Sequence, residues 1–397
     1  MAAEDLASSW SPRLDVPVPT LADAAFCPDA DQDGSRDAWL CPATGDDCDD
    51  ADPRVTPNTE RWVPPGPFLM GSASTQAGRD EAPVHVVHLS GYCLDRRERA
   101  RDGALLQGVT LDEAVTTCAA EGKRLPTEAE WEKAARGGCE HAGDPTRCDA
   151  ADLRAYPWGA AAPNCARANH RTAAHGAPRP CEAGADTAAR NAGPYGHEEM
   201  AGNLWEWVSD RYHPAVYTEA ARHDPAGPRE GDLGVLRGGA WDTFPTNMRV
   251  SNRFTSALGG SATGVRCARA RHPLRPDDVA PMRLATVRGE LRGGPFVGRR
   301  INVVAFEASD TSGGAPVPGR SPAAEVVLTP TRDATLAFAI PVPVGAAYVV
   351  MAALEADGPP VPGAPAASSG GMGIAAQSPV RVDGPVDGLT ITIRAAP

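Results

Sequence analysis

The pattern of apolar and polar residues changes near Ala280 and divides the chain into two kinds of structure. Before this point, short apolar runs such as 66–72 and 84–89 predict strands, and they alternate with helical segments as in a mixed α+β domain. After it, β-branched and apolar residues alternate between Gly and Pro turns, which predicts a small antiparallel β-sandwich. The strands predicted for this second part are 284–294, 300–307, 323–340, 345–355 and 386–394.

Two helices are predicted from their ends. Thr110 precedes Glu113 by three residues, and Thr127 precedes Glu130 by three, so each pair forms a Thr-x-x-Glu capping box. Glycines close both segments, the first at Gly122 and the second at 137–138. These boundaries place two short helices between the early strands and the aromatic motifs that follow.

Four motifs carry a family resemblance: Gly-Lys-Arg-Leu-Pro-Thr-Glu-Ala-Glu-Trp from Gly122, Ala-Gly-Asn-Leu-Trp-Glu-Trp from Ala201, Leu-Arg-Gly-Gly-Ala-Trp from Leu236, and Gly-Val-Arg-Cys-Ala from Gly264. Together they resemble the formylglycine-generating enzyme domain, a variant of the C-type lectin fold. The resemblance implies an α+β domain over residues 62–275. The predicted all-β sandwich then occupies residues 280–397.

The resemblance also shows what is missing. Copper-dependent members of the family carry two cysteines after the Arg-Gly-Gly-x-Trp strand, and this chain has Thr243 and Met248 in their places. Because soft sulfur ligands select Cu(I), copper and oxidase chemistry are not expected here. Met248 is interpreted as core packing. The alternative is an oxidase of this family with altered copper ligands, in which Met248 or a thiol such as Cys93 replaces the missing pair.

Residues 26–61 are rich in aspartate, after an irregular arm at 1–25. The first 60 residues hold fourteen acidic residues against three arginines, a net charge of −11 of the chain's −13. Aspartates on alternate positions before a glycine turn can direct their oxygens to one hard cation, so a calcium-binding segment is predicted. The aspartates assigned to it are Asp29, Asp31, Asp33, Asp47, Asp49, Asp50 and Asp52. A solvated acidic linker is the alternative.

The family resemblance implies a second, structural calcium site. Carried over by position, its ligands are Glu199, Gly202, Leu204 and Glu206. The alternative is that Glu206 is a buried acid paired with an arginine such as Arg237. The resemblance also implies a disulfide between Cys118 and Cys267.

The ten cysteines form an even set without a Cys-x-x-Cys pair, which favours disulfides and an oxidising compartment. Scattered buried thiols in a cytosolic protein are the alternative. Pairing of Cys139 with Cys148 and of Cys165 with Cys181 is a guess, and the partners of Cys27, Cys41, Cys48 and Cys93 stay open. A secreted, periplasmic or cell-surface bacterial protein is expected, although no signal peptide and no run of about 20 apolar residues is visible.

These features predict a calcium-stabilised, catalytically inactive domain that binds a protein, peptide or glycan or serves a structural role. The residues expected to face the ligand are Trp241, Asp242, Asn247, Arg249, Asn252 and Arg253. Nucleic-acid binding is not expected, because the chain beyond residue 60 is nearly neutral and lacks clustered lysine and arginine. The sequence leaves the oligomeric state open.

Overall fold

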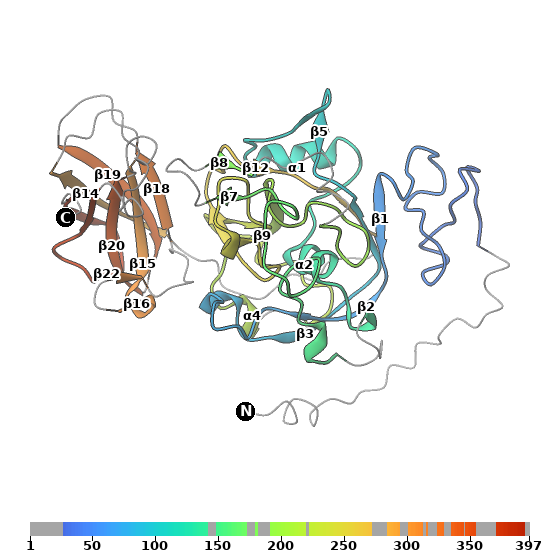
Figure 1. Cartoon of the computed structure of the whole chain (residues 1–397), viewed down its shortest axis with the longest axis horizontal. Coiled ribbons are helices and arrows are strands. Elements are labelled where there is room, and N and C mark those ends of the chain that lie inside the picture. The colour runs from blue at the N-terminus through green and yellow to red at the C-terminus, as the bar shows by residue number, and fades with distance from the viewer. Residues whose placement is uncertain are drawn as a thin grey trace.

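The computed structural model describes residues 27–141, 148–172, 179–181, 191–219, 222–271, 284–293, 301–312, 315–316, 324–328, 335–344, 346–354 and 371–393. The arm predicted at 1–25 lies outside these residues. Figure 1 shows the Asp-rich segment beside a central part of mixed helices and strands, and a part from Leu284 onward that is built mainly of strands. Within the described ranges, no helix is both long and apolar enough to cross a bilayer.

The central part is built from small sheets. One has the order β1 (Glu60–Val63), β4 (Tyr92–Asp95), β13 (Ala268–Arg269). Another has the order β11 (Phe254–Ser256), β10 (Gly234–Arg237), β9 (Trp205–Arg211), β12 (Thr263–Gly264). Two-stranded pairs are β2 (Gly66–Met70) with β3 (His85–Leu89), β5 (Ala100–Arg101) with β6 (Ala104–Leu105), and β7 (Arg171–Thr172) with β8 (Arg179–Pro180). Since β13 pairs with β4, the end of this part returns to its beginning.

Both predicted helices are confirmed, with their caps. In α1 (Leu111–Ala119) the Thr110 hydroxyl accepts from the Glu113 amide, and the Glu113 carboxylate accepts from the Thr110 amide. In α2 (Glu128–Arg136) Thr127 and Glu130 form the same reciprocal pair. A single turn, α4 (Val216–Glu219), follows β9.

Helix α2 lies at the centre of the core. Every one of its nine residues is buried, and the helix contacts β2, β3, β9 and β10. Trp131 packs among apolar residues such as Phe68, Met200 and Val250. A second cluster joins α1 to the aromatic motif through Leu111, Trp205, Trp207 and Cys267. The short motif that starts at Gly122 therefore supplies both the helix start and the centre of packing.

Five disulfides account for all ten cysteines. The predicted Cys118–Cys267 bond is confirmed and joins α1 to the strand region near β13. The two guessed pairs, Cys139–Cys148 and Cys165–Cys181, are also formed. The open cysteines pair as Cys27–Cys41 and Cys48–Cys93, and the latter ties the Asp-rich segment to β4.

The C-terminal part contains two larger sheets. The first has the order β19 (Leu336–Pro343), β14 (Leu284–Arg292), β23 (Val386–Thr392). The second has the order β18 (Ala324–Leu328), β15 (Ile301–Glu307), β20 (Ala346–Leu354), β21 (Gly371–Ile374), and β22 (Val380–Val382) also pairs with β20. A further pair is formed by β16 (Thr311–Ser312) and β17 (Ala315–Pro316), which run antiparallel.

Residues from both of these sheets share one core, for example Val287 and Ile340 with Val303 and Val350. The expectation of purely antiparallel strands was wrong, because β14 and β23 run parallel. The alternation of apolar residues specifies which face of a strand is buried, but it carries no information about strand direction.

Removing the Cys118–Cys267 bond should destabilise the central part more than removing a local bond. With Cys118→Ala and Cys267→Ala together, the chain-entropy model gives a loss of about 5 kcal/mol in the free energy of unfolding, against about 3 kcal/mol for Cys139→Ala with Cys148→Ala. Tryptophan fluorescence during urea unfolding measures both, because all eight tryptophans lie before residue 242. Equal losses would show that the length of the loop closed by a disulfide does not determine how much that disulfide contributes to stability.

Candidate metal centre

The Asp-rich segment folds through turns that its own aspartates stabilise. The amide of Asp33 donates to Asp31 Oδ1 (3.2 Å), Ser35 to Asp33 (2.7 Å), and Asp49 to Asp47 (2.9 Å). Such turns are typical of Asp, whose short side chain reaches the backbone two residues ahead. Each of these aspartates thus uses one carboxylate oxygen for its turn and leaves the other available.

The available oxygens converge. One carboxylate oxygen from each of Asp31, Asp47 and Asp50 lies within 4.8 Å of the others, and Asp29, Asp31 and Asp33 form a second such group that shares Asp31. One buried oxygen on each of Asp29, Asp31, Asp33 and Asp47 has no hydrogen-bond partner. Asp50 joins the two halves of the segment, since its Oδ1 accepts from the Ala30 amide at 2.8 Å.

The electrostatics of this group favour a cation. Burial, with further contributions from Asp33, Asp31 and Asp50, raises the pKa of Asp47 to about 6. Burial also raises the pKa of Asp31. Buried carboxylates without partners are costly, and a calcium ion that takes six to eight oxygen ligands satisfies both their charge and their lone pairs. The residues present therefore fit calcium.

Two of the predicted aspartates lie outside this group and have other partners. Asp49 forms an ion pair with Arg269 at 2.8 Å. Asp52 pairs with Arg54, which lowers the pKa of Asp52 to about 2. Both carboxylates are held by guanidinium groups, and neither belongs to the two groups of convergent oxygens.

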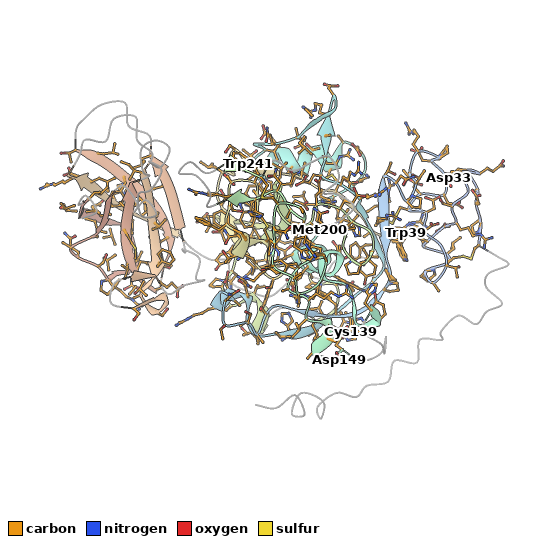
Figure 2. All side chains as sticks on the ribbon, viewed as in Figure 1. Asp33, Trp39, Cys139, Asp149, Met200 and Trp241 are labelled. Atoms are coloured by element: carbon orange, nitrogen blue, oxygen red, sulfur yellow. A yellow bond between two sulfur atoms is a disulfide. The ribbon has the colours of Figure 1, made fainter. Side chains whose placement is uncertain are left out.

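The candidate centre is attached firmly to the central part. Trp39 donates to the Cys48 carbonyl (2.9 Å) and packs edge-on against Trp62, whose indole donates to the Pro42 carbonyl (3.1 Å). Figure 2 shows Asp33 and Trp39 on the Asp-rich segment, away from Met200 and Trp241. With the Cys48–Cys93 bond, these contacts link the shape of the aspartate loop to β1 and β4.

The second predicted calcium set, near β9, has competing partners. Glu206 is buried and accepts from Arg266 Nη2 (2.7 Å) and Trp131 Nε1 (2.6 Å), with further bonds from Arg266 Nε. These contacts match the alternative of a buried acid paired with an arginine, but the partner is Arg266 instead of Arg237. Since a carboxylate offers about four acceptor positions, few remain for an ion. Calcium at Glu199, Gly202, Leu204 and Glu206 stays a prediction.

Glu98 is a neighbour of this loop that sequence reasoning missed. Its buried carboxylate accepts from the Leu204 amide (2.9 Å) and from the Asn203 side chain. Burial, then the negative charges of Glu206 and Glu199, raise the pKa of Glu98 well above its usual value. No sequence signal marked Glu98, because it lies outside all four motifs that carry the family resemblance.

The segment from Trp241 to Arg253 is less open than expected. Trp241, Asp242 and Asn247 are half-buried, whereas Arg249, Asn252 and Arg253 are buried and do not face solvent. The expectation of a surface position was wrong for Asn252 and Arg253, whereas Arg249, although buried, lines a pocket together with Tyr156 and Ser251. Arg249 is drawn inward by Glu81, at 2.5 and 2.8 Å, and Arg253 by Glu128, at 2.7 and 3.0 Å.

The two positions of the missing cysteines are both engaged in structure. Met248 is fully buried and packs with Ala168 and Ala201, beside Tyr156 and Trp158. The Thr243 hydroxyl accepts from the Ala240 amide at 2.8 Å. Met248 therefore acts as core packing, which was the favoured interpretation.

Helix α2 anchors this segment through buried ion pairs. Arg237 donates to Glu128 (2.9 Å) and Glu132 (2.5 Å), and Arg253 also binds Glu128. Glu132 in turn accepts from Arg136 and from the Gly71 amide. Two acids one helical turn apart thus fix β10 and the end of the Trp241–Arg253 segment against the same helix.

Comparison with known proteins identifies the central part. Residues 96–271 match the family model described as the sulfatase-modifying factor enzyme 1-like domain. The chain contains a domain of the formylglycine-generating enzyme family. A "Formylglycine-generating enzyme" of Thermomonospora curvata is 36% identical over 232 residues, which cover 54% of this chain and 65% of that enzyme.

A "Hercynine oxygenase" of Mycolicibacterium smegmatis is 40% identical to the chain over 154 residues. The match covers 37% of this chain, which spans only a third of that relative's length. Among solved structures, PvdO from Pseudomonas aeruginosa is 21% identical, with a TM-score of 0.38 over 53% of this chain and 93% of PvdO. The two curated relatives described here thus have names that state different activities.

Asp47→Asn should weaken calcium binding about tenfold or more, because it removes charge and an unpartnered oxygen from the convergent group. Isothermal titration of chelator-treated protein with calcium measures the effect. Asp52→Asn is the matched control, since that carboxylate is held by Arg54, and it should leave the affinity within twofold. Equal affinities of both variants and the parent protein would reject the Asp-rich segment as a calcium site.

Glu128→Gln should cost about 3–5 kcal/mol in the free energy of unfolding, because it removes the closer carboxylate partner of buried Arg253 and leaves only Asp80, at 3.9 Å. Arg54→Gln breaks an exposed pair and should cost much less, because solvent screens the two charges. Urea unfolding followed by tryptophan fluorescence compares the two. A small loss for Glu128→Gln would mean that the buried pairs do not hold the segment in place.

Proposed function

We propose that this chain is a calcium-stabilised extracytoplasmic protein whose formylglycine-generating enzyme domain binds a ligand or serves a structural role instead of oxidising thiols. The observation that carries the proposal is the use of all ten cysteines in five disulfides. A copper site of the family's kind needs a pair of thiolates, and Thr243 and Met248 stand where that pair would be.

The disulfides also support a location outside the cytosol, since cytosolic reductants keep thiols reduced. Calcium at the convergent aspartates is consistent with such a location, where the ion is abundant. The two C-terminal sheets, which share a core, support a β-sandwich that would act as a spacer or an attachment module.

The protein surface that we propose to face a ligand is smaller than the sequence suggested. It retains Trp241, Asp242 and Asn247, and the structure adds Phe244, which is exposed and has the Arg171 guanidinium 4.9 Å over its ring. An exposed aromatic ring beside a cation and polar side chains suits a protein, peptide or glycan ligand.

The alternative, an oxidase with altered copper ligands, has less support. Cys93 is buried and bonded to Cys48, and Met248 has no exposed surface. Neither the Cys93 sulfur nor the Met248 sulfur is accessible to a substrate thiol without rearrangement of the core. An oxidase would therefore need a different pair of sulfur ligands.

A peptide oxidation assay tests the proposal. The protein, with calcium and with Cu(I) maintained by ascorbate so that disulfides persist, should form no aldehyde on a cysteine-containing peptide. The Thermomonospora curvata enzyme serves as the positive control. As a matched variant, Thr243→Cys with Met248→Cys should gain near-stoichiometric Cu(I) binding, and we expect none in the parent chain. Aldehyde formation by the parent chain would overturn the proposal.

A further inference from the structure

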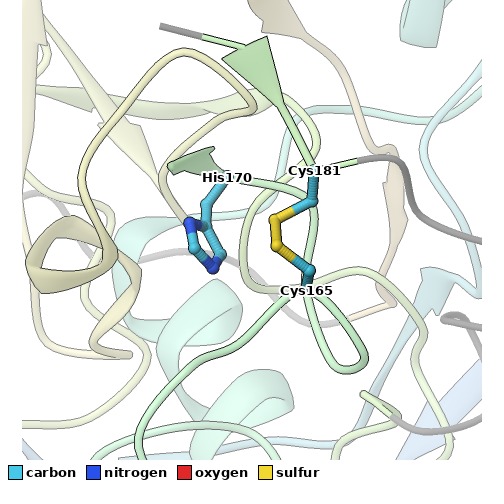
Figure 3. A group of neighbouring side chains, drawn as sticks. All are labelled: Cys165, His170 and Cys181. Carbon is cyan, nitrogen blue, oxygen red and sulfur yellow. A yellow bond between two sulfur atoms is a disulfide. The ribbon is translucent and has the colours of Figure 1, made fainter. Parts of the chain in front are cut away.

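A group of soft and borderline ligands lies away from the aspartates. The sulfur atoms of Cys165 and Cys181 and a ring nitrogen of His170 all lie within 4.8 Å of one another. Figure 3 shows the imidazole beside the Cys165–Cys181 disulfide. In the oxidised chain the two sulfurs bond to each other, so this group holds ligand atoms in a closed form.

His170 is arranged as a ligand. Its Nδ1 lies 2.9 Å from the Arg171 carbonyl, which can only accept a hydrogen bond, so Nδ1 carries the proton and Nε2 carries the lone pair. Nε2 is buried without a hydrogen-bond partner, and only 5% of the residue is exposed. A histidine whose other nitrogen is fixed by a carbonyl is the common form of a metal ligand.

The surrounding backbone holds the group next to the positions of the family's missing cysteines. The Cys181 amide donates to the His170 carbonyl (3.0 Å), and the Arg171 amide donates to the Thr243 carbonyl (2.9 Å). Ala168, two residues before His170, packs against Met248. The disulfide and the imidazole thus border the Thr243–Met248 segment.

We propose that reduction of the Cys165–Cys181 bond opens a Cys₂His site for a thiophilic metal ion, Zn(II) or Cu(I). A dithiol reductant supplies two electrons and two protons and becomes a disulfide, while Cys165 and Cys181 become thiols. Metal binding then releases both thiol protons, and His170 contributes the Nε2 lone pair. Three protein ligands leave a position open for water or a substrate on zinc. This inference is independent of the proposed function.

The same chemistry is less accessible at the other group that contains two cysteines. Cys48 and Cys93 lie near Glu60, but both sulfurs are buried and Glu60 is already paired with Lys123 and Arg269. Cys118 and Cys267 are also buried. Cys165 is half-buried, so a reductant reaches it more readily than these four cysteines.

The test uses the full chain, folded and oxidised in calcium, then treated briefly with a dithiol that is removed before titration with Zn(II). We expect the reduced protein to bind one equivalent more than the oxidised protein. Cys165→Ser with Cys181→Ser should lose this equivalent. The matched control, Cys139→Ser with Cys148→Ser, removes another short-loop disulfide and should retain it.

His170→Ala separates the histidine from the thiols. It keeps all five disulfides, so its fold is verified in the oxidised form by peptide mapping before reduction. We expect its Zn(II) affinity to fall at least tenfold, and cobalt substitution should lose the spectrum of a Cys₂His site. The proposal is overturned if reduction adds no bound metal, if the Cys165/Cys181 variant binds as much as the parent, or if His170→Ala leaves the affinity unchanged.

Discussion

The buried ion pairs of helix α2 determine where the other parts of the central domain lie. Glu128 and Glu132 have almost no exposed surface, and their charges are balanced by Arg237 on β10 and by Arg253 and Arg136. Because an unpaired buried charge is costly, these arginines have little freedom to turn outward. The pairs therefore fix β10 and Arg253 to a single helix, while Trp241, Asp242 and Asn247 in the same segment stay partly exposed.

This constraint also explains what the sequence could predict. The capping boxes of α1 and α2 and the Cys118–Cys267 bond follow from local motifs or from the family resemblance, and the structure confirms them. The partners of buried charges do not follow from local patterns. Arg249 and Arg253 look like surface residues in the sequence, but acids far along the chain, Glu81 and Glu128, draw them inward.

The same reasoning applies to the metal-binding predictions. The alternate aspartates were recognised from spacing, and the structure brings Asp31, Asp47 and Asp50 together while it pairs Asp49 and Asp52 with arginines. Neither Glu98 nor the group around His170 was marked by a sequence motif. The residues that contact them come from parts of the chain that are not adjacent in sequence. The hard oxygen ligands of the Asp-rich segment and the soft sulfur ligands beside His170 therefore lie in separate places. Only the sulfur ligands are blocked, by the covalent bond between them.

The most direct test of calcium stabilisation without copper chemistry is elemental analysis by mass spectrometry of the oxidised full chain, purified without added metals. We predict at least one equivalent of calcium per chain and no stoichiometric copper, because four buried aspartate oxygens of the Asp-rich segment lack hydrogen-bond partners and the sulfurs are bonded to each other. Stoichiometric copper in the oxidised protein would contradict this prediction. So would the absence of bound calcium together with a melting temperature that is the same in chelator as in added calcium.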